Sequence, residues 1–428
     1  LIQNLKNYCD NNKKVLISHV SGNQNSKNLI VDLYKKKKLF KYVTSINFNT
    51  KKFPLNLLPQ IIKNVLNKRS IIGINENKII TKFFFFEIFN LIKLRIFKNI
   101  FKNSKEKYSS LTSEYIQHQC DKIDLLSSKV IKKNYLNISA IYAYEMGAYN
   151  TFKEAKKYDI KCIYELPTPY WREREKKISQ ELKSYKNTDL RKITLFYKKK
   201  KTKFFKKLDS EIQNADIIIV PSNYVKKTIL KSKFNYKKIL VAPYGFPKPI
   251  SKKKWFNRNN KIEILFVGSL VPNKGILCLL KTIKVLSKIN QDKFNLTIVG
   301  SGPLENLLKQ KLPNSTFKKY LSHNQLLKEM EKKDIFLFPT LYEGLSLSLS
   351  EAMSRGMVVI STANSGLLEF GNKSNSILVK VNDHNQIAKK ISFLINNPQK
   401  VKYLGMNAIE TSKKYNWQDF SKKVIDLI

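Results

Sequence analysis

The amino-acid sequence predicts an α/β protein with two domains, each built around a parallel sheet. Short runs of β-branched residues alternate with amphipathic helical stretches, a pattern typical of parallel strands with helices on both faces. A length of 428 residues fits two or three domains. Two alternating series are separated by the breaker-rich stretch Pro243–Pro249 and the polar, basic stretch Lys252–Asn260, which we interpret as a linker.

Each series supplies its own set of expected strands. The first contains Val15–Val20, Tyr42–Ile46, Ala140–Tyr144, Cys162–Leu166, Ile217–Pro221 and Ile239–Pro243. The second contains Ile262–Val267, Leu296–Val299, Ile335–Pro339, Val358–Ser361 and Ile377–Val379, and a helix is expected at Trp417–Ile428. These elements predict a first domain over residues 1–245, a second over residues 246–415 and a terminal helix over residues 416–428.

Composition and cysteine spacing exclude several classes of protein. Hydrophobic residues make up 42% of the chain and aromatic residues 11%, which is enough for packed cores and argues against disorder. No run reaches the ~18 apolar residues of a membrane-spanning helix. The cysteines show no metal-ligand spacing; they are Cys9, Cys120, Cys162 and Cys278. We therefore expect a cytoplasmic protein with reduced, buried thiols, and the residues present show no signal peptide.

The chain is strongly basic, with 80 Lys and Arg residues against 32 Asp and Glu and a formal net charge of +48. Such an excess favours a polyanionic partner, either nucleic acid or an anionic membrane surface. Codon usage is the competing explanation, because only seven of the basic residues are Arg while Asn and Ile are plentiful. The excess is denser in residues 1–245, at +32, than in residues 246–428, at +16.

The segment 82–103 interrupts the first series with a run of aromatic and aliphatic residues. Basic residues punctuate this run, namely Lys93, Arg95, Lys98 and Lys102. A basic, aromatic-rich helix of this kind can lie in a membrane interface, which is where we expect an inner-leaflet contact. It can also be a core helix followed by a solvated basic tail, because the segment is apolar on almost all sides.

The segment 342–360 carries the strongest chemical signal. It follows an expected buried strand and places Glu343 and Gly344 in the turn after it. Parallel α/β sheets bind their ligands at the carboxyl ends of the strands. The N–H groups that open the next helix form a phosphate site; they belong to Gly344, Leu345 and Ser346. Glu343 and Glu351 can reach separate hydroxyls of one sugar-bearing ligand, although a capped helix with two surface glutamates is the alternative.

This segment resembles the signature of glycosyltransferase family four, a large group of retaining enzymes with the GT-B fold. The family's motif is E-G-F-x-x-x-x-x-E-A-M-A-x-G-x-P-V. The matching positions here are Glu343, Gly344, Glu351, Ala352, Met353, Gly356 and Val358. The sequence departs from the motif with Leu345 in place of Phe and Met357 in place of Pro. The resemblance implies two Rossmann-like domains that face each other across a cleft, with the C-terminal helix returning to the first domain.

Two further segments of the second domain resemble the same family. The stretch 266–275 resembles F-V-G-R-L-x-x-x-K-G, which assigns Lys274 to the donor diphosphate and Gly268 to donor binding. Ser269, also a donor-binding candidate, replaces the family's Arg, so one expected cation is missing. The stretch 298–304 resembles V-G-x-G-P beside the nucleotide, which adds Gly300 and Gly302. A solvated surface charge is the alternative for Lys274.

The first domain resembles the family less closely. Ala215–Ser222 and Val241–Gly245 match short family segments, and Gly22 lies where the family often has a Gly-rich loop beside the donor phosphate. Many members place a His near the donor sugar, and here Glu165 and Tyr170 are the candidates to replace it. We expect the four histidines to be structural; they are His19, His118, His323 and His384.

By this resemblance, the predicted function is transfer of a sugar from a nucleotide-sugar donor to an acceptor hydroxyl with retention of configuration. Glu343 and Lys274 are the catalytic candidates: Glu343 would orient the sugar, and Lys274 would stabilise the departing diphosphate. Glu351 would accept hydrogen bonds from the ribose. The acceptor would be held by the first domain. No Asp-x-Asp motif occurs, which predicts a reaction that needs neither a metal nor another cofactor.

The family and the basic first domain together favour a glycan or a lipid-linked acceptor in surface polysaccharide or glycolipid assembly, at the inner face of a membrane. Two other functions stay open. A basic protein that binds nucleic acid would use the fold as a scaffold, but the scarcity of Arg and the lack of a nucleic-acid motif lead us to expect no such partner. A GT-B nucleotide-sugar epimerase would release an isomerised donor.

Overall fold

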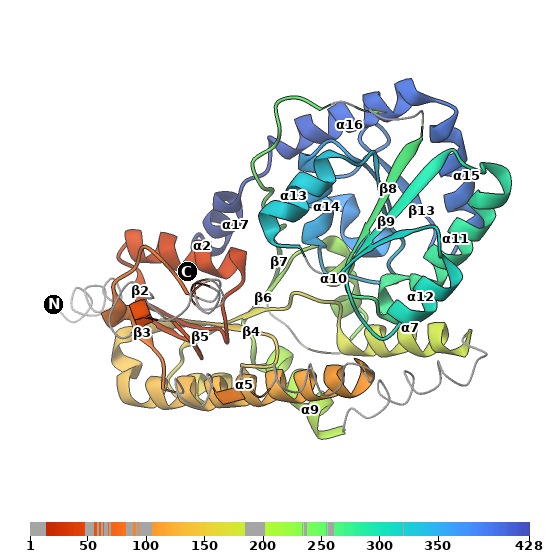
Figure 1. The fold of residues 1–428 in the computed structure, drawn as a ribbon. Helices are drawn as coiled ribbons and strands as arrows, with labels where there is room; N and C mark the ends of the chain where they lie inside the picture. Colours follow the sequence, from red (N-terminus) through yellow and green to blue (C-terminus); the bar gives the residue numbers. More distant parts are fainter. Residues whose placement is uncertain are drawn as a thin grey trace.

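The computed structural model shows two parallel sheets with helices packed against them (Figure 1). It describes residues 14–47, 55–57, 60, 63, 67, 70–82, 89–90, 93, 105–184, 202–232, 234, 238–253, 255, 261–319 and 321–428. The segment 82–103 lies almost wholly outside these residues, so its contact with a membrane stays a prediction. Among the described helices, none has both the length and the apolar character needed to cross a bilayer.

The first sheet has seven parallel strands in the order β3-β2-β1-β4-β5-β6-β7. Its strands are β1 (Lys14–Ser18), β2 (Leu39–Val43), β3 (Ile79–Ile80), β4 (Ile138–Tyr144), β5 (Lys161–Glu165), β6 (Ile217–Val220) and β7 (Lys238–Val241). Its helices are α2 (Gln24–Lys35), α5 (Lys105–Asn134), α6 (Tyr149–Lys156), α7 (Trp171–Lys183), α9 (Thr202–Asn214) and α10 (Asn223–Leu230). The strand order reverses between β1 and β4, and such a reversal is where α/β sheets bind ligands.

The second sheet has six parallel strands in the order β10-β9-β8-β11-β12-β13 and reverses between β8 and β11. Its strands are β8 (Ile262–Val267), β9 (Phe294–Val299), β10 (Thr316–Lys318), β11 (Ile335–Phe338), β12 (Val358–Thr362) and β13 (Ser376–Val379). Its helices are α11 (Ile276–Ile289), α12 (Glu305–Lys311), α13 (His323–Glu331), α14 (Leu347–Ser354), α15 (His384–Ile395) and α16 (Pro398–Ser412). The predicted pair of Rossmann-like sheets is confirmed.

The positions of the expected strands agree with the structure within two residues at each end, except at β2, and the short β3 and β10 were not among the expected strands. Strand β2 ends at Val43, three residues before the expected end. The hydroxyls of Thr44 and Ser45 both donate to the backbone oxygen of Val20, at 2.8 and 2.7 Å, and so hold these residues in the following turn. Strand β3 is a two-residue edge strand, too short to produce an alternating pattern.

Two residues of the linker between β7 and β8, Lys253 and Trp255, contact the helices of the second sheet. Nζ of Lys253 donates to the backbone oxygens of Lys333 and Arg355, at 2.5 and 2.9 Å. These oxygens lie just past the ends of α13 and α14, where a helix dipole favours a cation. Burial lowers the pKa of Lys253 to about 7. Trp255 donates from Nε1 to the oxygen of Gly356 at 2.8 Å, so this end of the linker packs onto the second sheet's helices.

The terminal helix α17 (Trp417–Ile425) leaves the second sheet and packs on α2 of the first (Figure 1). The ring of Tyr244 is stacked 6.5 Å from Trp417 and lies 5.8 Å from Phe420. A Cβ on Gly245 would lie 2.5 Å from the backbone nitrogen of Trp417, so only glycine allows this approach. The chain therefore returns to the first sheet, whereas the limits 1–245, 246–415 and 416–428 stay a prediction.

We predict that Gly245→Ala destabilises the protein by about 1–3 kcal/mol, because the added methyl group overpacks the contact with α17. Thermal unfolding followed by circular dichroism measures the loss. Gly147→Ala is the matched control, since a Cβ there meets its nearest atom at an ordinary 3.6 Å. An equal melting temperature for the Gly245→Ala variant and the parent would contradict the tight docking of α17.

Candidate functional site

At the carboxyl edge of the second sheet, Lys274 and Glu343 form an ion pair. Lys274 ends the short helix η4 (Pro272–Lys274) after β8, and Glu343 lies in the turn after β11. Nζ of Lys274 donates to Oε1 of Glu343, and the two side chains are 19% and 17% exposed. The ammonium also lies 5.6 Å from the ring centre of Phe338. Burial lowers the pKa of Lys274 to about 8, so the ammonium is mostly charged at neutral pH.

Gly275 makes this pairing possible. It adopts a left-handed backbone conformation with φ of 69°, and a Cβ there would lie 1.9 Å from the backbone oxygen of Pro339. The backbone nitrogen of Leu341 and the hydroxyl of Thr340 both donate to the oxygen of Asn273, each at 2.8 Å. The turns after β8 and β11 are therefore joined through backbone atoms, and their side chains meet in a fixed register.

The start of α14 offers fewer free amides than the sequence suggested. The N–H of Ser346, the N-cap residue, donates to the backbone oxygen of Ser365 at 3.2 Å, because the turn after β12 folds against this helix end. The expectation that this amide is open to a phosphate is therefore corrected. The N–H groups of Gly344 and Leu345 find no acceptor among the described residues. These two amides and Lys274 are the available donors for an anion here.

Glu351 lies farther along α14 and faces His323 at the start of α13. Nδ1 of His323 is 3.3 Å from Oε1 of Glu351; the His side chain is 60% exposed and the Glu side chain 14%. Burial raises the pKa of Glu351 to about 7. We expected His323 to be structural, and in the fold it lies beside Glu351. Only the spacing between α13 and α14 in the fold reveals the pairing.

The glycines of the β8 and β9 turns bring these turns together. A Cβ on Gly300 would lie 1.9 Å from the oxygen of Gly268, and one on Gly302 would lie 2.6 Å from the oxygen of Leu270. Ser269, between Gly268 and Leu270 in the chain, is exposed. The glycines thus have a packing role beside the ion pair, and their contact with a donor stays a prediction.

Gly22 and the two candidates for the missing His belong to the first sheet. The N–H of Gly22 donates to Nδ1 of His19 at 2.9 Å, so this amide is used within its own loop. Glu165 is 1% exposed and accepts hydrogen bonds from Nδ2 of Asn25 at 2.6 Å and from the hydroxyl of Tyr142. A carboxylate so enclosed does not reach a bound sugar. Tyr170 is also buried, and its hydroxyl donates to Asp209 at 2.8 Å.

The carboxyl edges of the two sheets touch at the same motif. A Cβ on Gly344 would lie 1.6 Å from the oxygen of Pro167, in the loop after β5. The hydroxyl of Ser222 donates to the oxygen of Gly344 at 2.5 Å. The N–H of Asn223 donates to Oε1 of Glu369 at 2.7 Å. The first sheet's loops therefore form one side of the site that holds Lys274 and Glu343.

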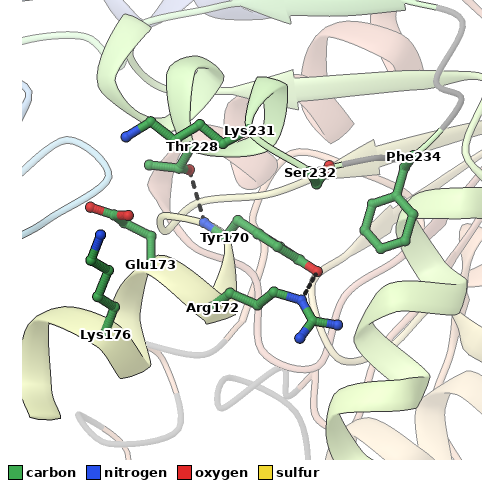
Figure 2. A pocket seen from close by; sticks show the side chains of 8 residues that line it. All are labelled: Tyr170, Arg172, Glu173, Lys176, Thr228, Lys231, Ser232 and Phe234. Carbon is green, nitrogen blue, oxygen red and sulfur yellow. Dashed lines mark hydrogen bonds between the residues drawn. The ribbon is translucent and has the colours of Figure 1, made fainter.

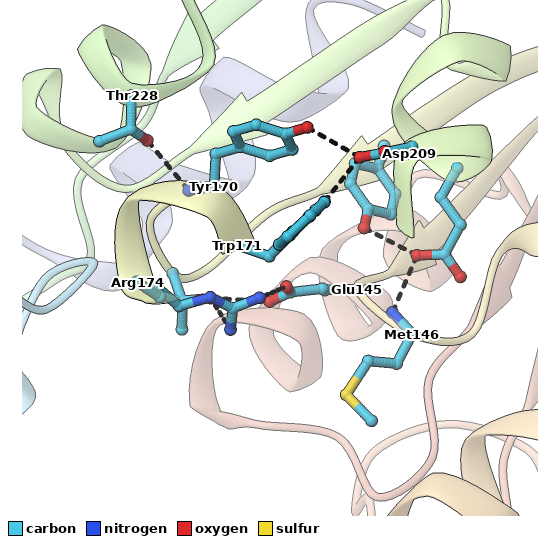
Figure 3. A network of polar contacts seen from close by, with 10 residues as sticks. Glu145, Met146, Tyr170, Trp171, Arg174, Asp209 and Thr228 are labelled. Atoms are coloured by element: carbon cyan, nitrogen blue, oxygen red, sulfur yellow. Dashed lines mark hydrogen bonds and ion pairs between the residues drawn. The ribbon is translucent and has the colours of Figure 1, made fainter. Parts of the chain in front are cut away.

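A polar network that includes Arg174 and Glu145 holds the loop after β5 in place (Figure 3). Arg174 donates from Nη2 to Oε1 of Glu145 at 2.7 Å and from Nη1 to the hydroxyl of Thr168 at 2.9 Å. The same hydroxyl donates to Oε2 of Glu145 at 2.8 Å. The Glu145 side chain is 7% exposed and that of Arg174 is 20% exposed. The guanidinium is thus held by two partners, while part of the Arg174 side chain is exposed.

A cavity of about 400 Å³ lies between the start of α7 and the end of α10 (Figure 2). It is lined by Tyr170, Arg172, Glu173, Lys176, Thr228, Lys231, Ser232 and Phe234. Hydrogen bonds join the lining residues to one another: the N–H of Tyr170 donates to the Thr228 hydroxyl, and Nε of Arg172 donates to the Tyr170 hydroxyl, both at 3.0 Å. Three cations face one carboxylate, so the cavity favours an anion beside aromatic rings.

No group of three or more His, Cys, Asp or Glu side chains that could hold a metal occurs in the part of the chain that the structure describes.

Comparison with known proteins identifies the second half of the chain. Residues 247–411 match the model of the family described as glycosyl transferases group 1. An uncharacterized glycosyltransferase of Methanocaldococcus jannaschii is 32% identical over 215 residues, which is 48% of this chain and 57% of that protein. The second half of the chain therefore resembles the group 1 glycosyltransferases. The match spans about half the length of the curated relatives.

The name of another relative states its acceptor. An N-acetylgalactosaminyltransferase of Campylobacter jejuni, named for an undecaprenol-diphosphate-linked acceptor, is 27% identical over 195 residues, 45% of this chain and 54% of that protein. The fold is shared with sucrose-phosphate synthase of Thermosynechococcus elongatus, at a TM-score of 0.64, 15% identity and coverage of 97% and 98%. It is also shared with a lipopolysaccharide outer core galactosyltransferase, at a TM-score of 0.59, 13% identity and coverage of 97% and 99%. The predicted GT-B fold is therefore confirmed.

We predict that affinity for a nucleoside diphosphate is greatest between about pH 7 and pH 8. Burial raises the pKa of Glu351 to about 7, so a lower pH protonates the carboxylate that accepts hydrogen bonds. Burial lowers the pKa of Lys274 to about 8, so a higher pH removes the ammonium charge. Titration calorimetry across this range measures the loss of affinity on each side of the optimum. Glu351→Gln is expected to abolish only the loss of affinity at low pH. If affinity still falls at low pH in that variant as it does in the parent, the assignment of Glu351 is contradicted.

Proposed function

We propose that this protein transfers a sugar from a nucleotide-sugar donor to an acceptor hydroxyl. The observation that carries the proposal is the ion pair of Lys274 with Glu343 at the carboxyl edge of the second sheet, next to the start of α14, which carries Glu351. A cation, two free amides and two partly exposed carboxylates match the diphosphate and hydroxyl groups of such a donor. The region also coincides with the family match over residues 247–411.

Each of these groups has a separate task in the proposal. Lys274 and the amides of Gly344 and Leu345 bind the diphosphate and stabilise the negative charge that grows on it as it leaves. Glu343 accepts hydrogen bonds from the sugar and holds the ring in position. Glu351, whose side chain is mostly buried, accepts hydrogen bonds from the ribose hydroxyls. The turns after β8 and β9 contact the nucleotide through Gly268, Ser269, Gly300 and Gly302.

The transfer is proposed to retain the anomeric configuration and to need no metal. The bond between the anomeric carbon and the phosphate oxygen breaks, and the acceptor oxygen bonds to that carbon on the same face. The acceptor's proton passes to the departing phosphate oxygen, so no protein base is consumed. The pairing of Glu343 with Lys274 supports this route, because a carboxylate neutralised by an ammonium is a poor nucleophile.

The acceptor is proposed to bind on the first domain's side and to be a glycan linked through a diphosphate to a lipid. The cavity beside Tyr170 supports this choice, since it combines aromatic walls with Arg172, Lys176 and Lys231. Lys176 and Lys231 form no ion pair among the described residues. Tyr170 in the cavity wall follows three residues after Pro167, whose oxygen lies against Gly344, so a long acceptor that occupies the cavity is proposed to present its sugar to the donor. Such an acceptor would bring the protein to the inner face of a membrane.

We predict that Lys274→Ala and Glu351→Ala each weaken binding of the donor nucleotide about 10- to 100-fold, since each removes hydrogen bonds that involve a charged group. Calorimetry with a panel of nucleotide-sugars identifies the donor and measures the loss. Lys284→Ala on α11 and Glu410→Ala on α16 are controls, because both side chains are exposed and outside the site. Unchanged affinity in both site variants would refute the donor site.

Product analysis completes this test. Transfer to an acceptor with retained configuration, seen by nuclear magnetic resonance, supports the proposal. Isomerised donor without transfer would instead indicate an epimerase. Tight, salt-sensitive nucleic-acid binding that Glu351→Ala leaves unaltered would indicate a polyanion-binding protein.

For the acceptor side, we predict that Lys231→Glu raises KM for a polyprenyl-diphosphate-linked sugar about tenfold and leaves KM for the donor unchanged. The new carboxylate repels the acceptor's phosphates at a distance from the donor. Lys226→Glu on the same helix is the control for net charge. Steady-state kinetics with each substrate varied in turn separates the two constants, and equal acceptor KM values would exclude the cavity.

A further inference from the structure

The edge that binds the diphosphate has too little positive charge of its own. Lys274 is already paired with Glu343, and Glu351 adds a second carboxylate nearby. Position 269, on the adjoining turn, holds an exposed serine and contributes no charge. A diphosphate brings at least two negative charges, and a partly buried site makes their repulsion costly. A second cation is therefore needed, and it must come from another part of the fold.

Arg174 is placed to supply this cation from the first domain. Its helix, α7, packs against η4, the short helix that carries Lys274. The loop that leads into α7 brings the oxygen of Pro167 into contact with Gly344. Burial disfavours the charge of Arg174, but Glu145 and the neighbouring Tyr342 hold its pKa above the ordinary value. Tyr342 directly precedes Glu343, so the packing of α7, the loop before it and the charge interaction with Tyr342 all place Arg174 close to the donor edge.

The guanidinium is also oriented before any ligand arrives. Glu145 and Thr168 each accept one of its N–H groups, at 2.7 and 2.9 Å (Figure 3). An arginine has five N–H donors in a rigid planar fork, so these two bonds fix the plane and leave other donors for an anion. The side chain is 20% exposed, whereas its partner Glu145 is only 7% exposed. Such a fork suits a diphosphate, which accepts two parallel hydrogen bonds.

We propose that Arg174 binds the diphosphate of the donor across the domain boundary and takes the place of the cation that position 269 lacks. This inference rests on the proposed function, because it needs a nucleotide-sugar at the site. Since Lys274 and Arg174 belong to different domains, the diphosphate bridges them and holds the two sheets' edges together. Glu145 and Thr168 are positioning residues that act through Arg174.

The test compares nucleoside diphosphates with the matching monophosphates by titration calorimetry. The base is the one that the parent protein binds most tightly in a panel of UDP, GDP, ADP, CDP and dTDP. Arg174→Ala is expected to weaken diphosphate binding about 10- to 100-fold, as for loss of charged hydrogen bonds, and to change monophosphate binding less than about twofold. Adding Ser269→Arg to this variant is expected to restore most of the diphosphate affinity, because it returns a cation to the same edge.

Two controls separate this role from a structural one. Lys183→Ala removes an exposed cation from the last turn of the same helix, and it should leave both nucleotides unaffected. Arg174→Gln keeps a hydrogen bond to Glu145 without the charge, and it replaces Arg174→Ala if circular dichroism shows that the latter is unfolded. Diphosphate selectivity should fall in Arg174→Gln as well.

The outcomes are distinct. Equal weakening of monophosphate and diphosphate, no rescue by Ser269→Arg, or unchanged diphosphate affinity in Arg174→Gln would each overturn the assignment of Arg174 while leaving the proposed function intact. If the parent protein binds no nucleoside diphosphate in the panel, the proposed function fails, and this inference fails with it.

Discussion

The site depends on close backbone contacts that no residue other than glycine permits. At Gly275 the turn after β8 presses against Pro339, and at Gly344 the turn after β11 presses against Pro167 of the opposite sheet. Both contacts lie at the carboxyl edges of strands, where Lys274 and Glu343 are displayed. Side-chain chemistry at this edge is therefore set by main-chain geometry, which is stiff, rather than by long side chains that must find each other.

This geometry decides how the charges behave. The ammonium and the carboxylate are brought together while both retain some contact with solvent. An isolated charge at the same depth would be strongly disfavoured, whereas the pair can be kept and then rearranged when an anion enters. The overall charge of +48 has little bearing on this arrangement. A few cations placed by the fold matter more to a bound phosphate than the many lysines on the surface, whose fields are screened by salt.

The sequence predicted the sites that lie within one continuous motif and missed those that need the tertiary fold. Glu343, Glu351 and Lys274 could be proposed from the sequence because a strand, a turn and a helix start place each of them locally, and their roles stay a prediction. Arg174 was missed, since its relation to the motif exists only through α7 and the loop after β5. The Ser346 amide was misjudged because its acceptor, Ser365, belongs to the turn after the next strand.

The same limit applies to the fold. Long, buried strands were found within two residues because continuous apolar runs mark them, as in β6 and β11. The end of β2 was misplaced because side-chain hydroxyls, not hydrophobic pattern, terminate it. Lys253 was assigned only to a linker, since nothing in its neighbours along the chain shows that two helix ends converge on it.

The return of α17 to the first sheet means that the chain crosses between the sheets twice. One crossing runs from β7 to β8, and the other runs from α16 to α17. The two crossing segments together define an axis. Rotation of one sheet and its helices about this axis would strain the crossing segments less than twisting or sliding would. A donor bound between the two sheets at the opposite edge would then hold them in a closed arrangement, and the Tyr244–Trp417 contact would lie close to the hinge axis.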